Sequence, residues 1–290
     1  MKKLISILFF SSILFSIDFI DRCGFHHQQT RNIRPNCDLF IDSPSGHFRV
    51  HYNATGNHSA TQSYALAVGE AADYSRNILV NIMGFLPEID DEDGIYDIYL
   101  QSHADGNYGY NAGDCDYPAV GDNYSCSGNQ VAGASFIVID NDFNYSCSDI
   151  PGYANLCVYE NSGIDVMKVV IAHEFFHAIQ RRYIMDASPN KSMEAYFKDR
   201  YFFELMSTWF EDVAYPEIND YLNFAWPYLQ TPELNISCYF DACNGVSTDD
   251  GYSLALFGHY LAKVYDEVDN EQNSTIIKTW SWISCHRAWY

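Results

Sequence analysis

One short stretch of this sequence has the residue types and spacing of a catalytic metal site. Residues 169–180 contain His173 and His177, with Glu174 directly after the first histidine, and no glycine or proline interrupts the run. Residues four apart on a helix project from the same face, so both imidazoles can reach one zinc ion. The glutamate can take a proton from a water molecule that zinc has acidified. We therefore expect an active-site helix here; the alternative is a surface helix with two unrelated histidines.

A catalytic zinc site needs a third protein ligand, and the segment after this helix supplies candidates. The third histidine of longer zinc motifs is absent, because Gln180 and Tyr183 stand where its glycine and histidine would be. Residues 201–212 instead contain Glu204 and Glu211. We favour Glu204, because it lies in a strongly apolar run where an unpaired carboxylate would be costly to bury. Polar residues that share or flank this face could hydrogen-bond a liganding histidine: Thr208, Glu211 and Asp212.

These two segments together resemble a family of secreted metallopeptidases of the gluzincin type. The resemblance rests on HEFFHAIQ at 173–180 and on the pattern Glu-x-x-x-x-Trp-x-Glu-Asp at 204–212, and it extends over residues 45–280. In that family the first glutamate of the second motif is the third zinc ligand. The resemblance thus implies a zincin-like fold in which His173, His177 and Glu204 bind zinc. It also implies that Glu174 is the general base.

Peptide hydrolysis also needs a hydrogen-bond donor for the oxyanion that forms on the attacked carbonyl group. Gluzincins generally take this donor from a Tyr or His of the C-terminal part of the chain. The segment 251–260 offers Tyr252, His259 and Tyr260, of which we keep His259 and Tyr260 as catalytic candidates. The alternative for each is a packing or surface position.

These residues predict a secreted zinc endopeptidase that holds one catalytic zinc ion and acts on a protein or peptide substrate. Two alternatives share the zinc site: a secreted binding or adhesion module with an inactive site, and a zinc hydrolase of another amide or ester. The presence of Glu174 and of a complete ligand set favours the enzyme. Calcium is a weaker expectation, because the acidic residues between 105 and 127 could bind it but their spacing fits no EF-hand.

Charge and composition exclude other classes of protein. With 38 acidic against 16 basic residues, the formal net charge is −22, so nucleic acids and anionic membranes would be repelled. A hydrophobic content of 48% excludes a disordered chain. No glycine-rich phosphate loop follows a predicted strand. The oligomeric state is not predicted.

Three features predict export from the cell. Residues 1–17 combine Lys2 and Lys3 with an apolar stretch, as in a cleaved signal peptide, after whose removal we expect no stable membrane association. Seven Asn-x-Ser/Thr sequons predict surface glycans: Asn53, Asn57, Asn123, Asn144, Asn190, Asn235 and Asn273. Four pairs of neighbouring cysteines fit disulfides, with Cys285 left over: Cys23/Cys37, Cys115/Cys126, Cys147/Cys157 and Cys238/Cys243.

Apolar periodicity predicts an α+β fold. The expected strands are 47–52, 95–101 and 134–140, and the expected helices are 61–85, 164–184, 193–214 and 252–267. Residues 102–130 are rich in Gly, Asn, Asp and Tyr, and are expected to form a long irregular loop.

The expected domain organisation places all of the chemistry in one unit. The chain divides into a signal peptide at 1–17, an extension at 18–45 and a catalytic domain at 46–290. Within the catalytic domain, we expect a mixed-sheet lobe with the active-site helix up to about residue 185 and a helical lobe from about residue 186. The cleft should lie between these two lobes. The chain ends soon after residues 276–280, where such metallopeptidases commonly continue, so a C-terminal truncation stays open.

Overall fold

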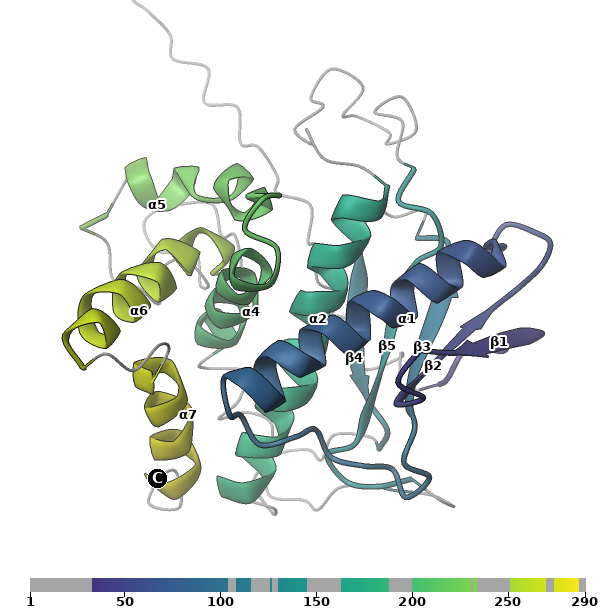
Figure 1. Ribbon diagram of the computed structural model, residues 1–290, viewed down its shortest axis with the longest axis horizontal. Coiled ribbons are helices and arrows are strands. Elements are labelled where there is room, and N and C mark those ends of the chain that lie inside the picture. The colour runs from purple at the N-terminus through teal and green to yellow at the C-terminus, as the bar shows by residue number, and fades with distance from the viewer. Residues whose placement is uncertain are drawn as a thin grey trace, which may run out of the picture.

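The fold is α+β, as predicted, with a five-stranded mixed sheet and helices (Figure 1). The structure is a computed structural model that describes residues 33–103, 108–115, 126, 130–144, 163–187, 200–230, 232–233, 251–269 and 274–286. The expected signal peptide lies outside these residues, as does most of the stretch for which calcium was considered.

The sheet has the strand order β1-β2-β3-β5-β4. Its strands are β1 (Leu39–Asp42), β2 (Phe48–Tyr52), β3 (Tyr96–Gln101), β5 (Ser135–Asp140) and β4 (Gly109–Gly113). The central strands β2, β3 and β5 are parallel, and β1 and β4 pair antiparallel to them at the two edges. The three predicted strands are thus the three central ones.

The two edge strands lie where no strand was predicted. Strand β4 falls inside the expected irregular loop 102–130, which is therefore corrected. Its sequence, GYNAG, has little intrinsic preference for strand, and pairing with β5 fixes its conformation. At the other edge, β1 belongs to the stretch 18–45 that was expected to precede the catalytic domain, and it pairs with β2.

Two long helices cover one face of the sheet. Helix α1 (Gln62–Arg76) begins at Thr61, whose side chain accepts a hydrogen bond from the Tyr64 amide, and it continues as a π-helix over Asn77–Ile82. Helix α2 (Ile164–Ala187) contacts α1 and strands β4 and β5. On the strands that carry them, Val50, Ile98 and Ile137 point to this face and join the main hydrophobic core.

Helix α2 is enclosed on several sides. Its opposite side packs against α4 (Arg200–Ala214) and α7 (Ser274–His286), while α6 (Ala255–Asp269) packs on α4 and α7. Every residue of α2 from 169 to 181 is buried. This explains why the helix is apolar on the faces that pack in the core, while its buried polar residues gather around His173, His177 and Gln180. Figure 1 shows α2 between the sheet and the group of helices that contains α4, α6 and α7.

The other face of the sheet carries a smaller apolar cluster around Tyr99, Tyr110 and Phe136. The chain just before β1 lies over this cluster. The guanidinium of Arg34 lies 5.1 Å from the centre of the Phe136 ring. It also donates hydrogen bonds to three carboxylates, namely those of Asp91, Asp97 and Asp114. Arg34 therefore fastens this segment to the outer face of the sheet.

Several expectations about export fall on described residues. A disulfide joins Cys115 and Cys126, as predicted. The partner considered for Cys37 is Cys23, which lies outside the described residues, as do both other expected cysteine pairs. Among the sequons, Asn57 and Asn144 are exposed and Asn53 is half-buried, while the other four lie outside the described residues. Among the helices that the structure describes, none has the length and apolarity that a membrane span requires.

Candidate metal centre

Three predicted ligands meet between α2 and α4. Oε2 of Glu204 lies 3.1 Å from Nε2 of His173 and 3.5 Å from Nε2 of His177. The three side chains are almost completely buried. The helical spacing of the two histidines puts both rings on one face of α2, with their centres 4.8 Å apart. The sequence prediction that Glu204, rather than Glu211, joins the histidines agrees with this arrangement.

Glu211 is placed behind the site instead. Its Oε1 lies 2.7 Å from Nδ1 of His173, on the ring nitrogen that does not face Glu204. A carboxylate in this position accepts the Nδ1 proton and leaves the lone pair of Nε2 directed at the centre of the site. Glu211 therefore has the orienting role that was considered for the polar residues of this helix.

His177 is held in a similar way by an amide group. Its Nδ1 lies 2.7 Å from Oε1 of Gln180, one turn further along α2. The Gln180 amide nitrogen donates to the carbonyl oxygen of Phe203 and to Oγ of Ser207, both on α4. Gln180 thus fixes the His177 ring and ties the two ligand-bearing helices together. The sequence reasoning gave Gln180 no such role, although its position three residues after His177 was the available signal.

The charges at the site stabilise one another. Burial alone would lower the pKa of His173, but hydrogen bonds to Glu204 and Glu211 and the nearby charge of Glu174 raise it to about 10. Burial alone would raise the pKa of Glu204, but the two histidines beside it hold its pKa well below the usual range. Opposite charges on the imidazole and on the carboxylates thus offset part of the cost of burying each of them.

The residues present fit a zinc ion. Two ligands that each lie about 2.1 Å from a tetrahedral zinc ion are roughly 3.4 Å apart, and the contacts of Glu204 with the two histidines are 3.1 and 3.5 Å long. Oε1 of Glu204 is buried and accepts no hydrogen bond from any residue that the structure describes. Two imidazoles and one carboxylate are also a common donor set of catalytic zinc. The group could therefore hold a metal ion.

Glu174 lies next to these ligands on α2, and it is buried. Its charge is close enough to His173 to contribute to the raised pKa of that histidine. Its main-chain carbonyl oxygen accepts a hydrogen bond of 3.1 Å from Nδ2 of Asn111 on β4. Sequence reasoning did not single out Asn111, because an asparagine in a glycine-rich stretch has no distinguishing pattern.

The three candidates for an oxyanion donor lie in different surroundings. His259 lies 3.5 Å from Asp212, and its ring is 4.8 Å from that of Tyr221. Tyr260 is 51% exposed and stacks on Phe257. Tyr252 is buried, with its ring centre 5.9 Å from that of His173. Of the three, Tyr252 is the one whose ring the structure places against a predicted ligand.

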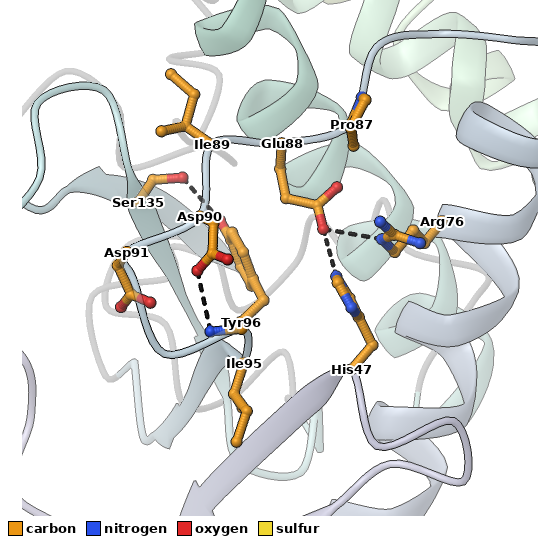
Figure 2. A pocket seen from close by; sticks show the side chains of 11 residues that line it. His47, Arg76, Pro87, Glu88, Ile89, Asp90, Asp91, Ile95, Tyr96 and Ser135 are labelled. Carbon is orange, nitrogen blue, oxygen red and sulfur yellow. Dashed lines mark hydrogen bonds and ion pairs between the residues drawn. The ribbon is translucent and has the colours of Figure 1, made fainter.

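A separate polar pocket lies at the amino ends of the parallel strands (Figure 2). It has a volume of about 190 Å³. The buried carboxylate of Glu88 points toward His47 and Arg76 and contacts both. Asp90, Asp91 and Asp93 lie beside the pocket and form a second group of neighbouring carboxylates. Asp90 and Asp93 accept hydrogen bonds from main-chain amides of their own turn, and Asp91 binds Arg34. Because these carboxylates already have partners, we assign no ion to them.

No protein-family model matches this chain, and no curated protein is similar enough to it to show a relationship.

Proposed function

We propose that this protein is a secreted zinc-dependent metallopeptidase that hydrolyses peptide bonds. The observation that carries the proposal is the buried group of His173, His177 and Glu204, with Glu174 beside it on the same helix. A structural zinc site is closed by four protein ligands, whereas a catalytic site has three and leaves one position for water or substrate. The group of three ligands with an adjacent carboxylate supports the catalytic kind.

Each residue of the group has a defined task in this proposal. His173, His177 and Glu204 would hold the ion, which when bound lowers the pKa of a water molecule and polarises the carbonyl group under attack. Glu174 accepts the proton of the attacking water and delivers it to the leaving amine. Glu211 and Gln180 keep the two imidazoles in the tautomer and orientation that present Nε2.

The proposal includes the zincin-like organisation suggested by the sequence. The sheet with α1 and α2 would form one lobe and the later helices the other, with substrate bound in a cleft between them. The α+β architecture and the position of the ligands at the contact of α2 with α4 support this organisation. The disulfide between Cys115 and Cys126 and the exposed sequons at Asn57 and Asn144 support export.

The test compares the wild-type protein with the variant Glu174→Gln. Both are purified from a secreting host, loaded with zinc, and assayed for metal content and for cleavage of a denatured protein. We expect about one zinc ion per chain in both proteins and a loss of at least about a hundredfold in cleavage rate in the variant. A matched control is Glu70→Gln, at an exposed position of α1, which should cleave like the wild type.

The other outcomes identify the competing functions. If both proteins bind zinc and neither cleaves peptides, esters or other amides, the chain is a metal-binding module. If only small esters or amides are cleaved, it is a zinc hydrolase of another class. A wild-type protein that binds no zinc would remove the basis of the proposal.

A further inference from the structure

Strand β4 packs against α2 next to Glu174, the proposed general base. Residues alternate along a strand, so Gly109, Asn111 and Gly113 share one face of β4 while Tyr110 and Ala112 join the cluster on the other face. A Cβ atom on Gly109 would lie only 3.3 Å from a methyl group of Val170, so the strand approaches the helix closely here. One strand position further on the same face, Asn111 meets Glu174.

The amide group of Asn111 uses both its donor and its acceptor side inside the protein. Its Nδ2 donates to the main-chain oxygen of Glu174 at 3.1 Å and to the hydroxyl of Tyr96 at 3.0 Å. Its Oδ1 accepts from Nε of Arg181 at 2.6 Å, and Nη2 of the same arginine donates to the Asn111 carbonyl oxygen at 3.0 Å. A flipped amide would place its oxygen against the Glu174 oxygen, so the network defines the orientation.

The bond to Glu174 differs from ordinary helix packing. The Glu174 carbonyl oxygen, as part of α2, already accepts the amide of Ala178, and Asn111 occupies its second acceptor position. Asn111 is itself fully buried, and the hydrogen bond from Arg181 is a second link between this residue and α2. The edge strand is therefore attached to the helix on both sides of His177, at Glu174 and at Arg181.

We propose that Asn111 is a positioning residue that fixes Glu174 relative to the sheet. The inference rests on the proposed function, because it assigns a task in the same reaction. Attack by water on the peptide carbonyl requires the general base to lie within a fraction of an ångström of its reactive position. A displacement of about 1 Å can lower the rate by about a hundredfold. A single hydrogen bond to the main chain of the base restrains this displacement without touching the metal ligands.

The variant Asn111→Asp isolates the bond. The new carboxylate still accepts from Arg181, but it cannot donate to Glu174, and it places an oxygen opposite the Glu174 carbonyl oxygen. The matched control is Tyr96→Phe, which removes the other acceptor of the same amide group and leaves the bond to Glu174. Steady-state kinetics, zinc content and amide hydrogen exchange, with and without zinc, are measured for wild type and both variants.

We expect Asn111→Asp to bind zinc like the wild type, with kcat lower by about tenfold or more and KM changed by less than about threefold. The amide of Ala178 should exchange faster in this variant, also in the metal-free protein. Tyr96→Phe should keep the wild-type kcat. A wild-type kcat and unchanged amide exchange in Asn111→Asp would overturn the inference. An equal loss of kcat in Tyr96→Phe would also overturn it, as would a loss of bound zinc in Asn111→Asp that matches its loss of kcat. If the wild type itself cleaves nothing, the proposed function fails, and the role assigned to Asn111 fails with it.

Discussion

Oε1 of Glu211 and Nδ1 of His173 are 2.7 Å apart, so this imidazole is held between two carboxylates of one helix. Glu204 and Glu211 are two turns apart on α4 and therefore project from nearly the same face. In the proposed zinc site, one helix thus supplies both a ligand and the group that orients a ligand of the neighbouring helix. This relationship would make the zinc affinity depend on a residue that does not touch the ion.

Replacing Glu211 with Gln should weaken zinc binding by about tenfold or more. The amide can still accept the Nδ1 proton of His173, but it lacks the charge that makes the imidazole a stronger ligand. Competition with a fluorescent zinc chelator measures the affinity. Asp212→Asn, at the adjacent position, serves as control and should bind zinc like the wild type. Equal affinities for both variants would show that Glu211 has no orienting role.

Zinc should stabilise the folded protein by an amount that rises with the logarithm of the zinc concentration once that concentration exceeds the dissociation constant. An ion that binds only the folded state adds about 4 kcal/mol to the free energy of unfolding at a thousand times its dissociation constant. We expect the melting temperature of the chelator-treated protein to rise as zinc is added back, measured by calorimetry. His177→Ala should abolish the rise, and His259→Ala should retain it. A zinc-dependent rise that survives in His177→Ala would place the ion elsewhere.

Glu88 should contribute to stability at neutral pH and lose its contribution in acid. Burial alone would raise its pKa, but hydrogen bonds from His47 and Arg76 lower it below the usual value. A group with a lowered folded-state pKa stabilises the fold above its unfolded pKa and stops doing so as the pH falls through the folded value. Glu88→Gln should therefore cost about 1–3 kcal/mol at pH 7 and progressively less below about pH 4.

Urea unfolding of wild type and Glu88→Gln at pH 7 and at pH 3.5 measures this difference. Glu70→Gln on α1 is the control, with an expected change of less than about 0.5 kcal/mol at pH 7. A difference between wild type and Glu88→Gln that grows in acid would have the wrong sign for this explanation.

Replacing Gly258 with Ala should destabilise the contact between α6 and α4. An added Cβ atom would lie 2.8 Å from Cβ and Cγ of Trp209, which is itself fully buried. Overpacking of this kind costs about 1–3 kcal/mol. Lys263→Ala, at an exposed position of α6, should change the free energy of unfolding by less than about 0.5 kcal/mol. Denaturant unfolding of both variants provides the test, and equal stabilities would mean that α6 can move away from Trp209 without cost.

The sequence predicted those parts of the molecule in which a local pattern reflects the environment. The parallel strands β2, β3 and β5 carry alternating or continuous apolar residues because they are buried, and α2 begins where the helical pattern begins. The two candidate ligand histidines were recognisable because helix geometry fixes their spacing. Glu204 could be chosen over Glu211 because its apolar neighbours made an isolated carboxylate costly.

What the sequence did not predict depends on contacts between distant segments. Strand β4 is defined by its pairing with β5 and by its approach to α2, and neither leaves a pattern in GYNAG. The same holds for Asn111, which meets Tyr96, Glu174 and Arg181 only after three elements have come together. Gln180 is an intermediate case, because its bond to His177 is local but its bonds to α4 are not.

The attachment of Arg34 to the outer face of the sheet has a consequence for proteolysis near the start of the described chain. The anchor lies ahead of β1 and binds carboxylates from three later segments, so salt bridges as well as strand pairing hold the first residues that the structure describes. A processing protease that trims the chain back to Ile33 would leave this anchor in place. Trimming beyond Arg34 would uncover Phe136 and leave three carboxylates without their shared cation. Within the described part of the chain, Arg34 thus marks a position beyond which shortening from the amino-terminal side should cost stability.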